Sequence, residues 1–261
     1  MQRASPPMRP SLSTPVQLTL VLLVFLLPGL AIRWAVFQMV PQLVEGGVPI
    51  LHAWTLAVVG PTALGAVMTL SLYWAVARPT WAKFRARFRL HRPKPLHIAL
   101  VPIALVAIIA GNFALSWTVP WLTTDLGVAL PPVQPEIFAD VYQELGTTAG
   151  EPTFMGQQIA GQRVFLALYW LVLWCGVAVV AEEVMWRGFA LPVLERAMGW
   201  LGWVVNGLLW CLPFHLYTLH TTISDLPLYL IVPFCAFLTG STWVSIAIHA
   251  ALVGLALLLL I

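Results

Sequence analysis

Charged side chains are scarce in this sequence. Only 9% of the 261 residues are charged, whereas a typical soluble domain has about 25%. Hydrophobic residues make up 60% of the chain, and its mean hydropathy is +0.89. So few charges cannot cover a surface in water, which excludes an ordinary soluble enzyme and a disordered regulator. The composition instead predicts an all-α integral membrane protein with several transmembrane helices.

Cysteine pairs and the common protease signatures are also missing. The three cysteines, Cys175, Cys211 and Cys235, all lie in apolar runs, and no CxxC occurs. This excludes a disulfide scaffold and indicates buried free thiols. No HExxH zinc motif is present. Ser241 lacks a rhomboid-type setting, and Asp225 is the only aspartate near a predicted span, so serine and aspartyl intramembrane proteases are disfavoured.

Long apolar runs dominate what is present. A helix needs about 20 mostly apolar residues to cross a bilayer. On this basis the sequence predicts seven spans, at roughly 16–40, 50–77, 96–119, 163–183, 201–219, 226–240 and 242–261. We expect one membrane domain. Its N-terminal part, 1–160, would hold the first three helices and two long loops, and its C-terminal part, 161–261, would hold the functional core.

The loops predict the orientation of the chain. The loop 78–94 has seven basic residues and no acid, and the loop 120–162 has five acidic residues and no base. Basic loops stay on the cytoplasmic side, so the first loop and the N-terminus are expected there, in a multi-pass protein of the plasma membrane. Membrane lipids are predicted partners of the basic loop. Nucleic acid is not, because seven of the 13 basic residues lie in this loop, where they are first a topology signal. A short helix is predicted at 136–145.

Two adjacent glutamates end the fourth predicted span. Glu183 and Arg187 are four residues apart, so they share a helix face and can form an ion pair. Glu182 is rotated by about 100° and has no cationic partner on its own helix. This spacing predicts a positioning pair, Glu183 with Arg187, and a free carboxylate, Glu182. The alternative is that both glutamates are interfacial charges at a helix end.

Two histidines lie inside other apolar runs. His215 follows Pro213, which opens the helix by removing a backbone hydrogen bond, and His249 lies about two turns into the last span. Ionisable residues in spans indicate a functional site. A carboxylate and an imidazole can activate water, and a second imidazole can stabilise an oxyanion. The same three groups, Glu182, His215 and His249, could instead bind a divalent metal such as zinc.

The order of these motifs resembles the CPBP family, which contains the CAAX proteases and bacteriocin-processing, Abi-type proteins. The match covers about 163–261, with Glu182 to Arg187 as EExxxR, His215 as the second motif and His249 as the third. The resemblance implies an intramembrane endopeptidase of the glutamic type that needs no cofactor. Glu182 and His215 would activate water, Glu183 and Arg187 would shape the site, and His249 would stabilise the oxyanion. The substrate would be a membrane-associated peptide or a prenylated protein.

The sequence departs from the family at two positions. Cys211 stands where the family usually has Phe, with Trp210 and Phe214 as possible substitutes. Val253 stands where the family often has Asn, which shares the oxyanion role with the histidine. Losing one oxyanion donor can slow a reaction roughly 10²–10³-fold. The alternative function is therefore a catalytically weak or inactive membrane scaffold or immunity protein with the same fold. A transporter is disfavoured, because no repeat is apparent.

Overall fold

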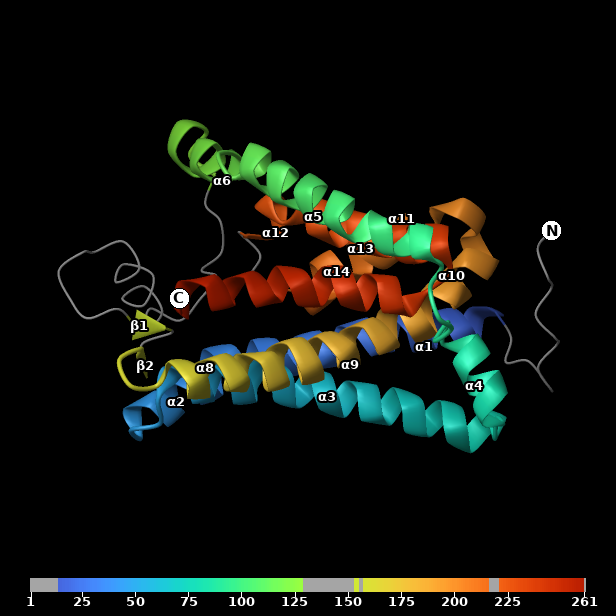
Figure 1. Cartoon of the computed structure of the whole chain (residues 1–261), viewed down its shortest axis with the longest axis horizontal. Coiled ribbons are helices and arrows are strands. Elements are labelled where there is room, and N and C mark those ends of the chain that lie inside the picture. The colour runs from blue at the N-terminus through green and yellow to red at the C-terminus, as the bar shows by residue number, and fades with distance from the viewer. Residues whose placement is uncertain (1–13, 129–152, 155–156, 216–220, 261) are drawn as a thin grey trace.

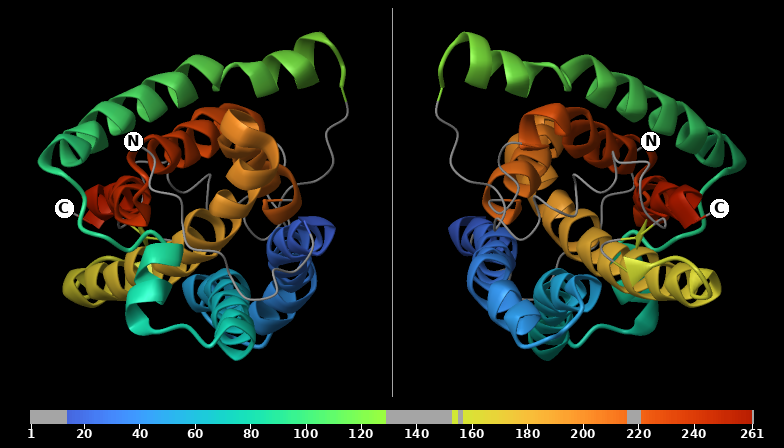
Figure 2. Two further views of the ribbon diagram at one scale, coloured as in Figure 1. Left: turned by 90° about the vertical axis from the view of Figure 1, so that its right-hand side faces the viewer. Right: turned by 90° about the vertical axis from the view of Figure 1, so that its left-hand side faces the viewer.

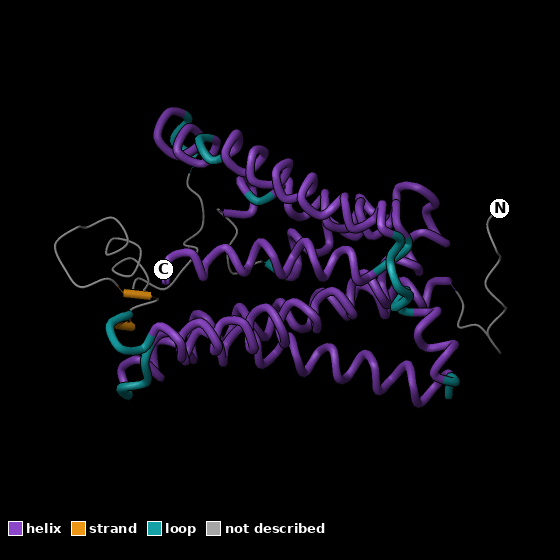
Figure 3. The backbone as a smooth tube through the Cα atoms, in the orientation of Figure 1, coloured by secondary structure: helices purple, strands orange, loops and turns teal. Residues whose placement is uncertain are grey.

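The protein is a bundle of helices. The computed structural model describes residues 14–128, 153–154, 157–215 and 221–260. The α-helices are α1 Thr14–Trp34, α2 Val40–Glu45, α3 Ile50–Ala77, α4 Trp81–Arg87, α5 Pro95–Leu115, α6 Thr118–Pro120, α8 Arg163–Tyr169, α9 Val179–Glu183, α10 Leu191–Met198, α11 Gly202–Leu209, α12 Thr221–Ser224, α13 Leu226–Thr239 and α14 Thr242–Gly254. Two strands of two residues, β1 Thr153–Phe154 and β2 Gln157–Gln158, pair antiparallel. The predicted all-α class is confirmed (Figure 3).

Other helical geometries connect many of these elements. The segments Ala35–Met39, Trp121–Asp125, Trp170–Ala178, Val184–Ala190 and Trp210–Phe214 are π-helical, and the segments Gly199–Leu201 and Leu255–Leu260 are 3₁₀-helical. π-Helical turns are rare and are frequently found at functional sites. Here two of them flank α9, which carries both glutamates, and a third precedes His215 directly.

Within the residues that the structure describes, four helical stretches are long and apolar enough to cross a membrane. They are Pro15–Glu45, Ile50–Ala77, Pro95–Asp125 and Arg163–Phe214, and α13 and α14 are shorter apolar helices. The first and third stretches extend five or six residues beyond the predicted spans. The fourth contains the predicted span 163–183 and residues 201–214 of the next one, and it turns at Gly199, whose positive φ of 62° favours glycine. The chain is thus an integral membrane protein, while the number of seven crossings stays a prediction.

The helices form two groups that meet at α14. Figure 1 shows α1 and α3 beside α8 and α9, with α5, α11 and α13 on the other side. Helix α14 contacts both α5 and α9. In the end-on views of Figure 2, α5 lies along the outer edge next to α13, which it also contacts. The helix that carries His249 therefore packs against the helix that carries Glu182 and Glu183.

The N-terminal helices pack directly on the C-terminal half. Helix α1 contacts the π-helical turn Trp210–Phe214, and α3 contacts α9. The contact with α1 depends on Gly29, because a Cβ atom there would overlap the carbonyl oxygen of Pro213. The core at this point is aromatic: Trp186 and Phe214 are fully buried, with ring centroids 4.4 Å apart. The division at residue 160 stays a prediction, and the predicted helix 136–145 lies outside the described residues.

Candidate functional site

The glutamate motif lies in the interior of the bundle. Glu182 and Glu183 form the last turn of α9, and Arg187 lies in the π-helical turn that follows. Glu183 and Arg187 are fully buried, and Glu182 is buried with 7% of its surface exposed. Burial of three charged groups is costly unless they are paired, so their partners decide what each can do.

Glu183 is held by two partners. Its Oε1 lies 3.2 Å from Nη1 of Arg187 and 2.9 Å from Nδ1 of His249. The first contact is the ion pair that the spacing of four residues predicts. The second links α9 to α14 across 66 positions of sequence. Glu183 therefore fixes the orientation of the His249 ring as well as that of the guanidinium.

The buried charge of Arg187 is compensated by few contacts. In the part of the chain that the structure describes, none of its buried guanidinium nitrogens has a hydrogen-bond partner. Its charge is compensated by Glu183 and by the face of Trp210, whose ring centroid lies 3.9 Å from Cζ. The ion pair and this cation–π contact are thus the main compensation for a fully buried cation.

Glu182 differs from its neighbour. Among the described residues it forms no hydrogen bond and no ion pair, and it lies within electrostatic range of His249 and Arg187. The buried indole N–H of Trp210 lies near its carboxylate without a formed hydrogen bond. The structure therefore contains one locked carboxylate and one carboxylate whose oxygens are available.

Both histidines use Nδ1 for a structural contact. Nδ1 of His215 lies 3.0 Å from the carbonyl oxygen of Trp210. A carbonyl only accepts, so this nitrogen donates, and Nε2 is the acceptor of the neutral ring. The same assignment follows for His249, because the Glu183 carboxylate accepts from its Nδ1. His215 and His249 lie within electrostatic range of each other.

Trp210 is the common neighbour of the predicted site residues. Its ring centroid lies 5.1 Å from that of His249 and 5.8 Å from that of His215, besides its contact with Arg187. The sequence indicated Trp210 only as a substitute for a family phenylalanine. Its position five residues before His215 is the one signal that could have pointed to a direct contact.

Two asparagines elsewhere in the chain could in principle supply the amide that is missing at Val253, but both are engaged in other hydrogen bonds. Asn206 donates through Nδ2 to the carbonyl oxygen of Trp186 at 3.1 Å, and Asn112 donates to Asp225 at 3.1 Å. Val253 accepts through its carbonyl from Nε1 of Trp170 at 2.8 Å. Neither asparagine therefore replaces the amide that the family often has at the position of Val253.

A metal site finds limited support in this geometry. In the described ranges, no group of three or more His, Cys, Asp or Glu side chains is arranged to hold a metal ion. The alternative set Glu182, His215 and His249 thus does not form a ready ligand shell here. The absence of a cofactor stays a prediction.

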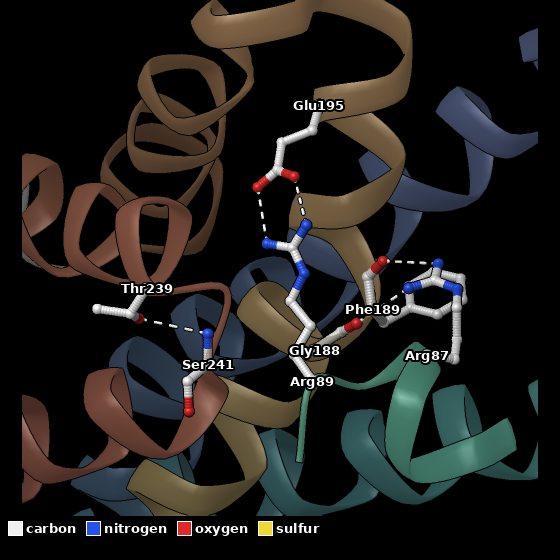
Figure 4. A network of polar contacts seen from close by, with 7 residues as sticks. All are labelled: Arg87, Arg89, Gly188, Phe189, Glu195, Thr239 and Ser241. Atoms are coloured by element: carbon white, nitrogen blue, oxygen red, sulfur yellow. Dashed lines mark hydrogen bonds and ion pairs between the residues drawn. The ribbon is translucent and has the colours of Figure 1, made fainter. Parts of the chain in front are cut away.

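The basic loop binds the motif helix from outside. Arg87 donates through Nη1 to the carbonyl oxygen of Gly188 and through Nη2 to that of Phe189, both at 3.0 Å (Figure 4). Burial and the nearby Arg196 lower the pKa of Arg87 to about 10, so it remains charged at neutral pH. These carbonyls belong to the π-helical turn after the glutamates. Arg87 therefore positions the turn that carries Arg187.

The same loop is tied to two further elements. Arg89 forms a two-pronged ion pair with Glu195 of α10, with Nη1 2.7 Å from Oε1 (Figure 4). At the start of α14, Thr242 donates from Oγ1 to the carbonyl oxygen of Phe88 at 2.8 Å. A Cβ atom at Gly188 would lie 2.8 Å from the Phe88 ring, so the loop also packs tightly. The loop thus connects the helices of Glu182 and His249.

Replacing Arg87 tests this connection. Arg87→Gln is expected to lower the free energy of unfolding by about 2 kcal/mol, because hydrogen bonds from a charged donor contribute more than neutral ones. Thermal unfolding of the protein in detergent measures the change. Lys83→Gln removes the same charge from an exposed position of the same helix and should leave the melting temperature unchanged. Equal melting temperatures for the two variants would contradict the positioning role.

Comparison with known proteins supports the family resemblance. Residues 164–255 match the protein family described as type II CAAX prenyl endopeptidase Rce1-like. No match is found among curated proteins or among solved structures. The matched range includes Glu182, Glu183, Arg187, His215 and His249. The resemblance to CAAX proteases is therefore confirmed for this range, which is similar at family level to an intramembrane peptidase.

Proposed function

We propose that this protein is an intramembrane endopeptidase of the glutamic type, which hydrolyses a peptide bond of a membrane-associated peptide or prenylated protein. One observation carries the proposal. Of two adjacent buried glutamates, Glu183 is locked by Arg187 and His249, while the Glu182 carboxylate has no such partner. An available carboxylate within electrostatic range of the His249 ring is suited to act as a general base.

Glu182 and His215 would activate the attacking water. The carboxylate accepts one proton as the water oxygen bonds to the scissile carbonyl carbon. His215, with Nδ1 held by the carbonyl of Trp210, presents Nε2 as a second acceptor that orients the same water. The proton then passes to the nitrogen of the leaving amine as the peptide bond breaks. Glu183 and Arg187 would keep α9 in the geometry that this step requires.

The oxyanion would need a donor. His249 could donate from Nε2 only as an imidazolium, because its Nδ1 already bonds to Glu183. The unpaired N–H of Trp210 lies near Glu182 and offers a second donor in place of the family asparagine. We therefore assign the oxyanion to His249 and Trp210 together.

Trp210→Phe tests the second donor. The substitution keeps an aromatic ring beside the histidines and removes the N–H, so kcat is expected to fall about 10²-fold with little change in KM. The rate is measured with the purified protein and a cleavable peptide. Trp186→Phe is the matched control, because its indole N–H is also buried and unpaired, and its ring packs against Trp210 and Arg187 as well as Phe25 and Phe214. Equal rates for the two variants would remove Trp210 from the mechanism.

The expected place of cleavage follows from the basic loop. Arg87 contacts Gly188, which lies six residues after Glu182, so the site is roughly 9 Å along the helix from the loop. The loop is expected on the cytoplasmic side of the plasma membrane. We therefore propose that the scissile bond is presented near the cytoplasmic face, where a lipid-anchored peptide can reach it.

A comparison of protein termini tests the function. Membranes from cells with the native chain are compared with membranes that contain Glu182→Gln at the same level. New termini that appear only with the native chain would support proteolysis and identify the substrate. Identical termini, with a binding or resistance phenotype that both proteins share, would contradict it.

The second candidate function is a membrane scaffold or immunity protein that does not cleave. It is favoured by Val253, which offers no side-chain donor where the family often has an asparagine. Under this hypothesis the buried charges would serve folding and binding alone. The same comparison of termini separates the two functions.

A further inference from the structure

A groove lies on the outside of the bundle, where the basic loop meets the motif helix. Its volume is about 560 Å³, within the range of small-molecule sites. The loop contributes Trp81, Arg85 and Arg92, and α14 contributes Trp243. Val180 of α9 and Val184 of the next turn form the wall between them. The groove thus follows the line along which the two helices of the candidate site meet.

The lining combines an apolar wall with positive charge at the rim. Trp81 is 62% exposed and Trp243 is 45% exposed, which suits rings at the level of lipid headgroups. Among the described residues of the lining, the charged ones are Arg85 and Arg92, and both are exposed. Arg85 has one long hydrogen bond, of 3.5 Å, to the carbonyl of Leu90. None of the lining residues in the described part of the chain is a carboxylate, so an anionic group at the rim meets no opposing charge from them.

We propose that this groove binds one anionic phospholipid, with an acyl chain against Val180 and Val184 and the phosphate between Arg85 and Arg92. The surroundings favour a lipid, because the groove opens on the apolar surface of an integral membrane protein. The charge favours an anionic headgroup, since guanidinium groups bind phosphate well and lipids of this kind attract basic segments. The proposal does not depend on whether the protein is a protease.

The lipid would lie behind the candidate site. Val180 and Val184 are two residues before and after Glu182, which places them about 200° around the helix from that carboxylate. An acyl chain in the groove would therefore cover the outer face of α9 without reaching the inner face. It would also contact α14 through Trp243. The lipid would thus contact both α9 and α14 and stabilise the packing of the helices that carry Glu183 and His249.

Lipid titration by native mass spectrometry tests the site. The purified full-length protein is titrated with phosphatidylglycerol or with phosphatidylcholine. The native protein is expected to bind one phosphatidylglycerol more tightly than phosphatidylcholine. In Arg85→Gln/Arg92→Gln the Kd for phosphatidylglycerol should rise roughly 25-fold, because each basic residue near an anionic lipid contributes about a fivefold effect. The Kd for phosphatidylcholine should stay within about twofold.

Lys83→Gln/Lys94→Gln is the matched control. It removes two charges from the same loop at exposed positions outside the groove. It should change the Kd for phosphatidylglycerol by less than about threefold. An equal loss in both double variants would show diffuse attraction to the loop and overturn the site. Equal affinities of the native protein for the two lipids would overturn it as well.

Two further measurements keep the test decisive. Arg92→Gln alone changes a residue outside any helix, so it should fold even where the double variant does not, and its Kd for phosphatidylglycerol should rise about fivefold. Glycerol phosphate, which has the headgroup charge without acyl chains, should compete weakly. Strong competition by glycerol phosphate would instead identify a site for a free phosphate compound and contradict the role of the apolar wall.

Discussion

Glu182→Gln is expected to lower kcat by about 10²–10⁴-fold, because the substitution removes the proposed general base. Glutamine has nearly the same size as glutamate, and Glu182 takes part in no ion pair among the described residues. The melting temperature in detergent should therefore change by only a few degrees. The rate is measured with the purified protein and a peptide that spans a cleavage site found in the comparison of termini.

Glu45→Gln is the control for this prediction. It makes the same chemical change on an exposed residue at the end of α2, away from the site. It should retain both the native rate and the native melting temperature. Full activity of Glu182→Gln would contradict the assignment of the base and would move that role to His215. A large fall in melting temperature would instead show that Glu182 stabilises the fold.

The fold class could be predicted because it depends on composition and on local patterns. The scarcity of charge and the apolar runs indicate membrane helices without any knowledge of contacts. The residues at which helices begin and end were harder to predict, because the apolar runs are longer than the about 20 residues that cross a bilayer. The stretch Arg163–Phe214 shows this, because it is helical almost throughout and turns only at Gly199.

The candidate site could be predicted in part. The contact of Glu183 with Arg187 follows from helix geometry alone, since it joins residues four positions apart. The contact of Glu183 with His249 joins two helices and has no local signal. The same holds for the clamp of Arg87 on Gly188 and Phe189, which the sequence indicated only as part of a topology signal. Contacts of this kind depend on how the helices pack, which local sequence patterns do not show.

The tautomers of the two histidines also could not be predicted from the sequence. An imidazole in a span can donate or accept, and the choice depends on what its other nitrogen contacts. Here Nδ1 of His215 bonds to a backbone carbonyl and Nδ1 of His249 to Glu183. This geometry is why we propose that His249 donates to an oxyanion only as an imidazolium. It is also why Trp210 enters the proposal.

The second large effect is expected at the buried ion pair. Arg187→Met should lower the free energy of unfolding by about 3–5 kcal/mol, because it leaves the fully buried Glu183 without its cation. It also removes the contact with the face of Trp210. Equilibrium unfolding in detergent measures the loss. Arg196→Met removes an exposed arginine from α10 and should change stability by less than about 0.5 kcal/mol.

The double variant Glu183→Gln/Arg187→Met separates the charge from the packing. If an uncompensated buried charge causes the loss, removing Glu183 as well should restore part of the stability, since replacing both members of a buried pair is often nearly neutral. His249 would then keep a hydrogen-bonding partner in the amide. If the double variant is no more stable than Arg187→Met, the guanidinium stabilises the bundle through Trp210, and the ion pair contributes little. In either case cleavage should be lost in the double variant. Glu183 and Arg187 would no longer hold α9, and with it Glu182, in the geometry that the proposed reaction requires.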